Sequence, residues 1–297
     1  MNSRFDITFV GHMCYDEIVP FGGEQYVQAG SAVLCGAMAA VRTGRRVAVV
    51  TKLAPEDDHI VRSMRDEGVE VFTVASPVTT YNRVVHPSAN VDEREMIMLR
   101  DSGVFVADDY PAIDSACIHL AGISDREFDL PFIRSLKARG GSLSADLQSF
   151  VRQVDPETRV IHFRDAPDKR EIVALLDRVK LDVVEAELLT GTSDLGRAAE
   201  IIASWGCPEV VITRSDGVLA RVNGVEHFAA FSNRSVVGRT GRGDTTFAAY
   251  LSRRMDHEPA AALLFAAALV SLKMETPGPF RGTMQQVLRR MEEDHGG

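Results

Sequence analysis

Short runs rich in Val and Ile alternate along this sequence with segments of helical character. The pattern predicts strands at 7–10, 47–51, 69–74, 117–120, 142–146, 160–163, 181–184 and 209–213. Helices are expected at 29–40, 61–67, 131–139, 169–178 and 194–205, with two more starting near Asp244 and Pro259. Alternation of this kind is typical of a mostly parallel sheet covered by helices on both faces. The predicted fold class is therefore a three-layer α/β/α domain.

Two segments interrupt this alternation. Residues 79–103 contain β-type residues and polar alternation without helical periodicity, which predicts a small antiparallel sheet. Such a sheet is either a lid that excludes water from a site or a surface hairpin without a role. Residues 218–230 form a second predicted hairpin, with a type I′ turn at Asn223 and Gly224. No linker or repeat divides the chain, so we expect one domain over 1–297 with a lid from 79–103 and part of 12–28.

The charge and the cysteines limit the partners and the setting. With 33 basic and 42 acidic residues, the net charge of the chain is −9, which disfavours nucleic acid because a phosphate backbone is itself anionic. The most apolar stretch, 260–272, is too short to span a membrane and predicts a buried helix. The four cysteines lack the spacing of a metal site and two lie in apolar runs, as in a reduced cytoplasmic protein.

The segment 238–251, GRTGRGDTTFAAYL, carries the clearest chemical signal. Glycines precede Asp244, and Phe247, Tyr250 and Leu251 recur at helical spacing after it. The start of such a helix presents free backbone N–H groups to an anion, and Gly241 and Gly243 would let a phosphate approach the backbone. A carboxylate beside a phosphate site makes sense as a general base that faces a neutral hydroxyl. The plainer alternative is that Asp244 only caps a helix after a Gly-rich turn.

Other common catalytic patterns are missing from the sequence. There is no Walker A P-loop, no HExxH metal pair and no nucleophile elbow around a serine. A dinucleotide-binding oxidoreductase would need a GxGxxG segment after the first strand, and the chain has none. These absences argue against a P-loop enzyme, a hydrolase with a catalytic triad and a dinucleotide-binding oxidoreductase.

The string TGRGDTTFAAYL resembles the C-terminal signature of the ribokinase-like (PfkB) carbohydrate kinases. In that family a Gly-x-Gly-Asp segment forms an anion hole and supplies the catalytic Asp. The resemblance implies that Gly241, Arg242 and Gly243 form the hole and that Asp244 is the base. The chain departs from the family at Arg242, where a small residue is usual, and at Gly238, where an acidic residue often stands. Arg242 would add a positive charge near the phosphates.

Further matches to the family extend over most of the chain. On the acceptor side, the resemblance assigns substrate contacts to Asp16, Gly30 and Ser31. On the donor side, 182–185 (DVVE) resembles the family's Asn-x-x-Glu motif, of which only Glu185 carries over, acting on Mg²⁺ through water or phosphate. The segment 213–217 (TRSDG) resembles the nucleotide loop, shortened by about one residue, and implies donor contacts from Thr213, Arg214 and Gly217. Taken alone, each matched residue could also have a purely structural role, in a helix cap, a turn or tight packing.

One branch of the family is more similar than the others. The strings SADLQSFVR, EAELLTGTSDL and METPGP, with DERE in the lid segment, are similar to bacterial myo-inositol kinases. This resemblance implies a cyclic polyol substrate, Arg94 as a lid contact, and ATP with Mg²⁺ as donor and cofactor. Kinases for ribose, a ketohexose or a nucleoside stay open as alternatives, as does a degenerate homologue that only binds a ligand. Lid sheets in this family can form dimer contacts, so a homodimer is also open.

Overall fold

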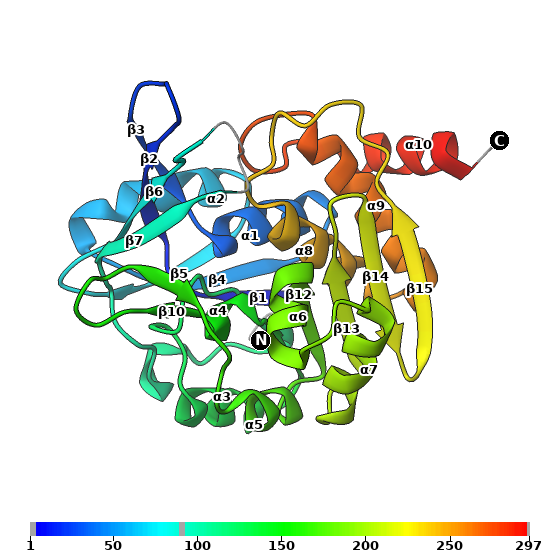
Figure 1. Cartoon of the computed structure of the whole chain (residues 1–297), viewed down its shortest axis with the longest axis horizontal. Coiled ribbons are helices and arrows are strands. Elements are labelled where there is room, and N and C mark those ends of the chain that lie inside the picture. The colour runs from blue at the N-terminus through cyan, green and yellow to red at the C-terminus, as the bar shows by residue number, and fades with distance from the viewer. Residues whose placement is uncertain (1–3, 89–92, 296–297) are drawn as a thin grey trace.

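A nine-stranded sheet forms the centre of the molecule (Figure 1). The computed structural model describes residues 4–88 and 93–295. The strand order is β15-β14-β13-β12-β9-β8-β1-β4-β5. All neighbours from β5 to β13 in this order pair in parallel, and β14 and β15 complete the edge as antiparallel strands. The predicted mostly parallel sheet is confirmed.

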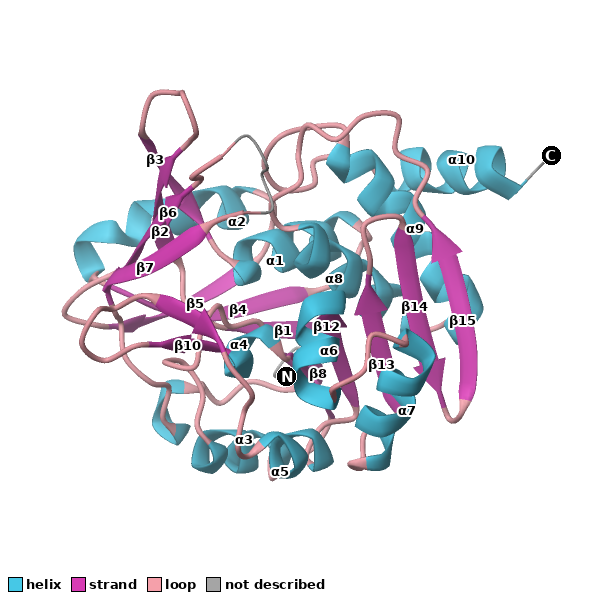
Figure 2. Cartoon of the chain, viewed as in Figure 1, coloured by secondary structure: helices cyan, strands magenta, loops and turns pink. Residues whose placement is uncertain are grey.

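The strands of this sheet are β1 (Phe5–Val10), β4 (Val47–Leu53), β5 (Glu70–Ala75), β8 (Ser115–Leu120), β9 (Ser142–Asp146), β12 (Arg178–Asp182), β13 (Glu209–Thr213), β14 (Gly217–Val222) and β15 (Val225–Ala230). One face packs against α1 (Ala32–Arg42), α2 (Arg62–Asp66), α8 (Arg242–Arg254), α9 (Pro259–Met274) and α10 (Met284–His295). The other packs against α3 (Leu130–Lys137), α4 (Gln148–Val151), α5 (Lys169–Ala174), α6 (Val183–Thr190) and α7 (Leu195–Ser204). Figure 2 shows the resulting three layers.

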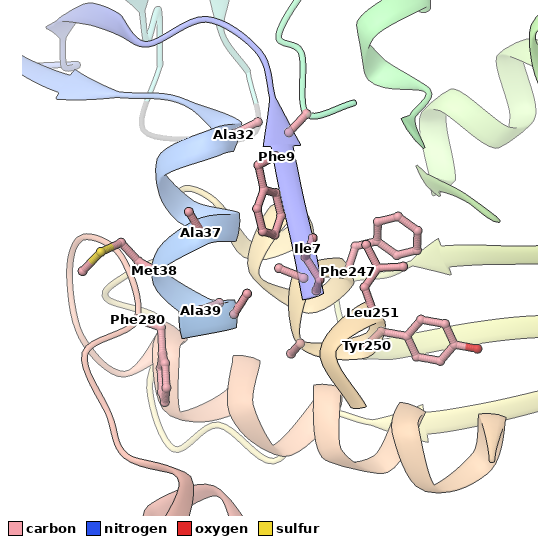
Figure 3. Close-up of a cluster of buried hydrophobic side chains, with 14 of the residues drawn as sticks. Ile7, Phe9, Ala32, Ala37, Met38, Ala39, Phe247, Tyr250, Leu251 and Phe280 are labelled. Atoms are coloured by element: carbon pink, nitrogen blue, oxygen red, sulfur yellow. The ribbon is translucent and has the colours of Figure 1, made fainter. Parts of the chain in front are cut away.

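The core consists of two hydrophobic clusters, one on each face of the sheet. Successive side chains of a strand point to opposite faces. Accordingly, Ile7 and Phe9 of β1 join the cluster under α1, α8 and α9, whereas Val10 joins the opposite cluster. Figure 3 shows part of the first cluster, in which β1 lies beside the alanines of α1 and Phe247 and Tyr250 of α8. The small residues of α1 let this helix lie close to both the sheet and α8.

A second, four-stranded sheet lies over one end of the domain, in the order β3-β2-β6-β7 (Figure 1). Its strands are β2 (Cys14–Val19), β3 (Tyr26–Gly30), β6 (Thr80–Val85) and β7 (Glu95–Arg100). It combines residues from both segments predicted to form the lid. A small hairpin of β10 (Arg152–Val154) and β11 (Ile161–Phe163) and two 3₁₀ turns, η1 (Pro55–Val61) and η2 (Ala107–Asp109), complete the described elements.

Most predicted elements are confirmed within a few residues, but three are wrong at one end. The helix expected at 169–178 ends at Ala174, and Arg178 already starts β12. The strand expected at 181–184 ends at Asp182, because Asp182 and Glu185 form a capping box that starts α6 one residue later. The helix expected from residue 29 starts at Ala32, because Tyr26–Gly30 pairs with β2 as a strand. The predicted type I′ turn is confirmed by positive φ angles of 48° at Asn223 and 87° at Gly224.

Within the described residues, no helix has the length and apolarity that a bilayer crossing would need. All four cysteines are buried and free, as the sequence predicts.

Candidate active site

The candidate site lies at the carboxyl ends of the parallel strands, where open α/β sheets usually bind ligands. The strands β9, β12 and β13 end there at Asp146, Asp182 and Thr213. Helix α8 starts at the same edge, as the close approach of Gly243 to Lys180 of β12 shows. The fold therefore brings together chain segments that lie far apart in sequence.

Helix α8 begins at a glycine with left-handed backbone geometry. Gly241 is its N-cap, with φ 77°, and a Cβ at this position would lie 2.4 Å from the Sγ atom of Cys35. Both the backbone angle and the close approach require glycine. The amide of Arg242 donates to the carbonyl of Arg239, whereas the amides of Gly243 and Asp244 lie in the first turn, where a helix offers no acceptor. The start of α8 thus has the geometry of an anion site.

Asp244 lies half-buried in this first turn. The side-chain amide of Gln148 donates to its Oδ1 atom at 3.4 Å and to the carbonyl of Gly122 at 3.0 Å. The backbone of Gln148 in turn donates to Asp146 at 3.1 Å. These contacts orient the carboxylate of Asp244. A residue that only capped a helix would not need a side-chain partner of this kind.

A buried ion pair lies directly behind the first turn of α8. The Nζ atom of Lys180 is 2.8 Å from Oδ2 of Asp146, and both side chains are almost fully buried. Burial alone would lower the pKa of Lys180, but Asp146, Glu185 and Asp244 raise it well above its usual value. A Cβ at Gly243 would lie 2.7 Å from Nζ, so glycine lets the ammonium approach the anion site. Lys180 therefore places a permanent positive charge beneath this site.

Glu185 is fully buried and belongs to the capping box of α6. Its Oε2 atom accepts from the backbone of Asp182 at 2.8 Å, while Oε1 has no hydrogen-bond partner and lies 3.6 Å from Arg152. Burial raises the pKa of Glu185 to about 7, against the opposing effect of Lys180. A buried carboxylate oxygen without a hydrogen-bond partner is a candidate ligand atom for a cation or a water on it.

The predicted acceptor residues lie on the lid side. Asp16 of β2 accepts from the side-chain amide of Asn82 at 3.2 Å and from the thiol of Cys14, and burial raises its pKa. A Cβ at Gly30 would lie 2.7 Å from its carboxylate, so these two residues are in contact. Ser31 caps α1, since its hydroxyl oxygen accepts from the amide of Leu34 at 3.1 Å. The structure thus gives Ser31 a capping contact rather than a free hydroxyl.

Positive charge gathers between the lid and α6. Arg94 precedes β7 and lies within electrostatic range of Arg152 and Arg239 and of the acidic pair Asp182 and Glu185. It also acts electrostatically on Asp16. Arg94 is therefore placed between the predicted acceptor side and the predicted donor side.

The predicted nucleotide loop is a tight turn between β13 and β14. Thr213 is buried and donates to the carbonyl of Leu181 at 3.2 Å. The guanidinium of Arg214 pairs with Asp216 through two contacts of 2.8 Å and lies over the ring of Phe228. Gly217 packs against the same ring, and a Cβ there would lie 2.5 Å from it. The turn is thus closed by its own side chains.

Comparison with known proteins identifies the family of the chain. No family model matches the chain. A solved pyrophosphate-dependent kinase in the ribokinase family, complexed with a pyrophosphate analog and myo-inositol, is 34% identical, with a TM-score of 0.86 over 95% of this chain and 99% of that one. The chain belongs to the ribokinase family. A sulfate complex of a pyrophosphate-dependent kinase of the family is 35% identical, with a TM-score of 0.88 over 96% of this chain and 99% of that one.

Two proteins of lower sequence identity also match. A cytidine kinase of Thermococcus kodakarensis is 26% identical over 257 residues, or 83% of this chain and 87% of that protein. Ribokinase of Arabidopsis thaliana, solved with ribose and ATP, has a TM-score of 0.78 at 18% identity, over 98% of this chain and 99% of that one. The second likeness confirms the ribokinase-like fold. This chain is accordingly a kinase of the ribokinase family.

The site of this ribokinase-family kinase fits Mg²⁺ held mainly by phosphate. Among residues 4–88 and 93–295, no cluster of three or more His, Cys, Asp or Glu side chains could hold a metal ion. Mg²⁺ usually keeps several waters and binds one or two carboxylates plus substrate phosphates. The free Oε1 atom of Glu185 suits such a role through water.

Sequence reasoning missed the residues that support Asp244. Gln148 lies in the matching string SADLQSFVR but was given no role, and Lys180 and Lys273 belong to no motif. Lys273 carried a signal, because it directly follows the apolar stretch 260–272. Asp146 and Arg152 pair with Lys180 and Glu185, respectively, and not with each other. His12 is fully buried, and its ring is hydrogen-bonded to the carbonyl of Gly103 and the hydroxyl of Thr80.

Proposed function

We propose that this kinase phosphorylates a hydroxyl of a small cyclic polyol, with myo-inositol as the favoured acceptor and Asp244 as the base. The observation that carries the proposal is the position of Asp244. Its carboxylate is oriented by Gln148 in the first turn of α8, with the cation Lys180 behind the same turn. The similarity to kinases described with myo-inositol supports the choice of acceptor.

In the proposed reaction the acceptor lies between Asp16 on the lid and Asp244. Its hydroxyl oxygen attacks the terminal phosphorus of the donor, and the hydroxyl proton passes to Asp244. The bond between this phosphorus and its bridging oxygen breaks, and the rest of the donor leaves. The amides of Gly243 and Asp244, the start of α8 and the ammonium of Lys180 stabilise the charge on the transferring group. Mg²⁺, when bound, neutralises charge on the donor phosphates.

We favour pyrophosphate over the ATP predicted from the sequence as the donor. Pyrophosphate has no base or sugar to bind, so its affinity must come from charge, which Arg94, Arg152 and Arg239 supply near Glu185. Three similar structures belong to kinases described as pyrophosphate-dependent. ATP is the second candidate, because the turn at 213–217 stands where the family resemblance places the nucleotide loop.

The donor and the acceptor are tested together. Phosphate-monoester formation is followed by ³¹P NMR with Mg²⁺ and either pyrophosphate or ATP. The acceptors are myo-inositol, ribose, fructose and cytidine. We expect turnover of myo-inositol with pyrophosphate. Turnover only with ATP would overturn the donor assignment, and turnover only of a sugar or of cytidine would overturn the acceptor. A ligand-induced melting shift without any monoester would indicate a degenerate homologue.

The base is tested by Asp244→Asn. Removing a positioned general base lowers turnover by about a hundred- to ten-thousand-fold. Binding of methylenediphosphonate, a non-hydrolysable pyrophosphate analogue, and the melting temperature should persist. Asp256→Asn, at an exposed position just past the C-cap of the same helix, is the control and should keep full activity. Near-normal turnover of Asp244→Asn would remove the base assignment.

The setting and the assembly state are also proposed. Four buried free cysteines support a reducing, cytoplasmic setting. Exposed Phe21, Tyr26 and Val27 on the β2–β3 hairpin support the homodimer that the sequence left open. Sedimentation of the protein at micromolar concentration tests the dimer, and a monomer would overturn it.

A further inference from the structure

Lys273 is a fully buried lysine on the apolar helix α9. Its ammonium donates to the backbone carbonyls of Gly238 and Thr240. The acceptors of this buried charge are thus carbonyls of one loop rather than a carboxylate. A buried ammonium is costly unless it is well bonded, so its presence here calls for a specific explanation.

The two carbonyls belong to the loop that leads into the anion site. Residues 238–240 immediately precede Gly241, the N-cap of α8. The amides of Val237 and Gly238 donate to the carbonyl of Met274 at 2.9 and 2.8 Å, so the loop runs against the end of α9. A Cβ at Gly238 would lie 1.7 Å from the carbonyl oxygen of Thr276, which explains why the acidic residue common in the family has no room here.

The charge of Lys273 also reaches the catalytic groups. Burial lowers the pKa of Lys273, whereas the charge of Asp244 opposes this effect. Cys35 lies against Gly241, where a Cβ would come within 2.4 Å of its sulfur. Lys273, Cys35 and Asp244 therefore surround the turn at Gly241. A change in the loop at 238–240 would be passed to the amides of Gly243 and Asp244 through this turn.

We propose that Lys273 is a positioning residue, a built-in cation that holds the loop at 238–240 and thereby sets the geometry of the anion site and of Asp244. The proposal rests on the proposed kinase function. A purely structural role would require only a side chain that fills the volume. The proposed role of Lys273 also requires a positive charge and N–H donors at the position of its ammonium.

Chemical rescue of Lys273→Ala tests this requirement. The fragment that the substitution removes corresponds to n-propylammonium. We expect kcat to fall by about 100-fold, the loss typical of misplacing a catalytic group by about 1 Å. Millimolar n-propylammonium should restore kcat in a saturable manner, whereas tetramethylammonium, which has no N–H donor, should not. KM for the acceptor should change less than kcat, because Asp16 lies on the lid.

Two variants control the rescue. Lys273→Met keeps the volume but blocks the space for an amine, so its kcat should be low and not rescued. Lys169→Met removes another lysine that donates to a backbone carbonyl, that of Leu189 at 2.7 Å, remote from the loop, and should leave kcat and amine response unchanged. A folded Lys273→Ala with normal kcat, or one that n-propylammonium does not rescue, would overturn the proposal.

A readout without catalysis separates this proposal from the proposed function. Hydrogen exchange of the amides at 239–244 should be faster in Lys273→Met than in the wild type, and binding of methylenediphosphonate should be weaker. Unchanged exchange and binding would overturn the role of Lys273. This measurement also decides the case if Lys273→Ala does not fold. If the wild type turns over no donor at all, the proposed function fails, while exchange and analogue binding still test Lys273.

Discussion

Buried charges set the chemistry of this site residue by residue. Lys180 and Asp146 neutralise each other, whereas Glu185 keeps one oxygen without a hydrogen-bond partner. Such an arrangement costs stability, because a buried carboxylate loses its hydration. Natural proteins retain unfavourable buried charges mostly where they bind or react with a ligand. Donor binding would therefore explain why the protein keeps the buried carboxylate of Glu185 although it lowers the stability of the fold.

The pH dependence of stability should report this cost. Burial raises the pKa of Glu185 from its usual 4.5 to about 7 in the folded protein. The folded state thus holds a proton that the unfolded state loses, so stability falls as the pH rises from about 4.5 to 7, by at most ~3 kcal/mol. In Glu185→Gln this loss of stability with rising pH should disappear. The melting temperature of the variant, relative to that of the wild type, should therefore increase as the pH rises from about 4.5 to 7.

Glu187→Gln provides the matched control, because Glu187 is exposed on the same helix. Its melting temperature should follow the wild type at every pH. A constant difference between Glu185→Gln and the wild type from pH 4 to 8 would contradict the assignment. Loss of pyrophosphate turnover in Glu185→Gln at pH 8 would accompany the gain in stability.

At this scale the sequence predicted the residues that stand in motifs and missed the ones that support them. Short patterns pointed to Asp244, Glu185 and Asp16 as candidates. The contacts of Gln148 and Lys273 were not predicted, because they join segments separated by 96 and 33 residues or more. Only the tertiary fold decides which buried polar side chains meet, and no local period in the sequence encodes it.

The first turn of α8 is the element on which the site depends most directly. A Cβ at Gly243 would lie 2.7 Å from the ammonium of Lys180 and 2.9 Å from its Cε atom. Gly243→Ala should therefore displace Lys180, lower kcat by about 100-fold and destabilise the fold by about 1–3 kcal/mol through overpacking. Activity assays and thermal melting measure the two effects.

A second glycine separates local strain from damage to the site. Gly44 has φ 83° and open space around it, so Gly44→Ala should cost about 1–2 kcal/mol through its backbone angle and leave kcat unchanged. Equal activity of the two alanine variants would show that Lys180 and α8 tolerate a methyl group between them.

Elements were predictable where the local signals agreed. The alternation of apolar runs located most strands, and Asn223-Gly224 fixed the β14–β15 hairpin. The end of β12 was misplaced because the apolar pair Val183 and Val184 continues the strand pattern, while the capping box at Asp182 starts a helix. The strand β3 was missed because it gains its hydrogen bonds only from β2.

At the scale of the whole molecule, the four-stranded sheet and the main domain each carry a residue of the proposed site, Asp16 on β2 and Asp244 on α8. Arg94 on the lid acts on Asp182 and Glu185 of the main domain, so a bound donor should draw the lid closer. We expect myo-inositol with methylenediphosphonate to slow hydrogen exchange in β6 and β7 as well as at the start of α8. Slowing confined to α8 would argue against a lid role for this sheet.

From β8 to β15, neighbouring strands of the main sheet follow one another in the order of the chain. During synthesis, the strand that carries Asp16 therefore emerges long before the helix that carries Asp244. A nascent chain can thus pair the strands of the four-stranded sheet before it holds the proposed base. It gains the proposed means to consume a donor only when α8 has docked on the main sheet.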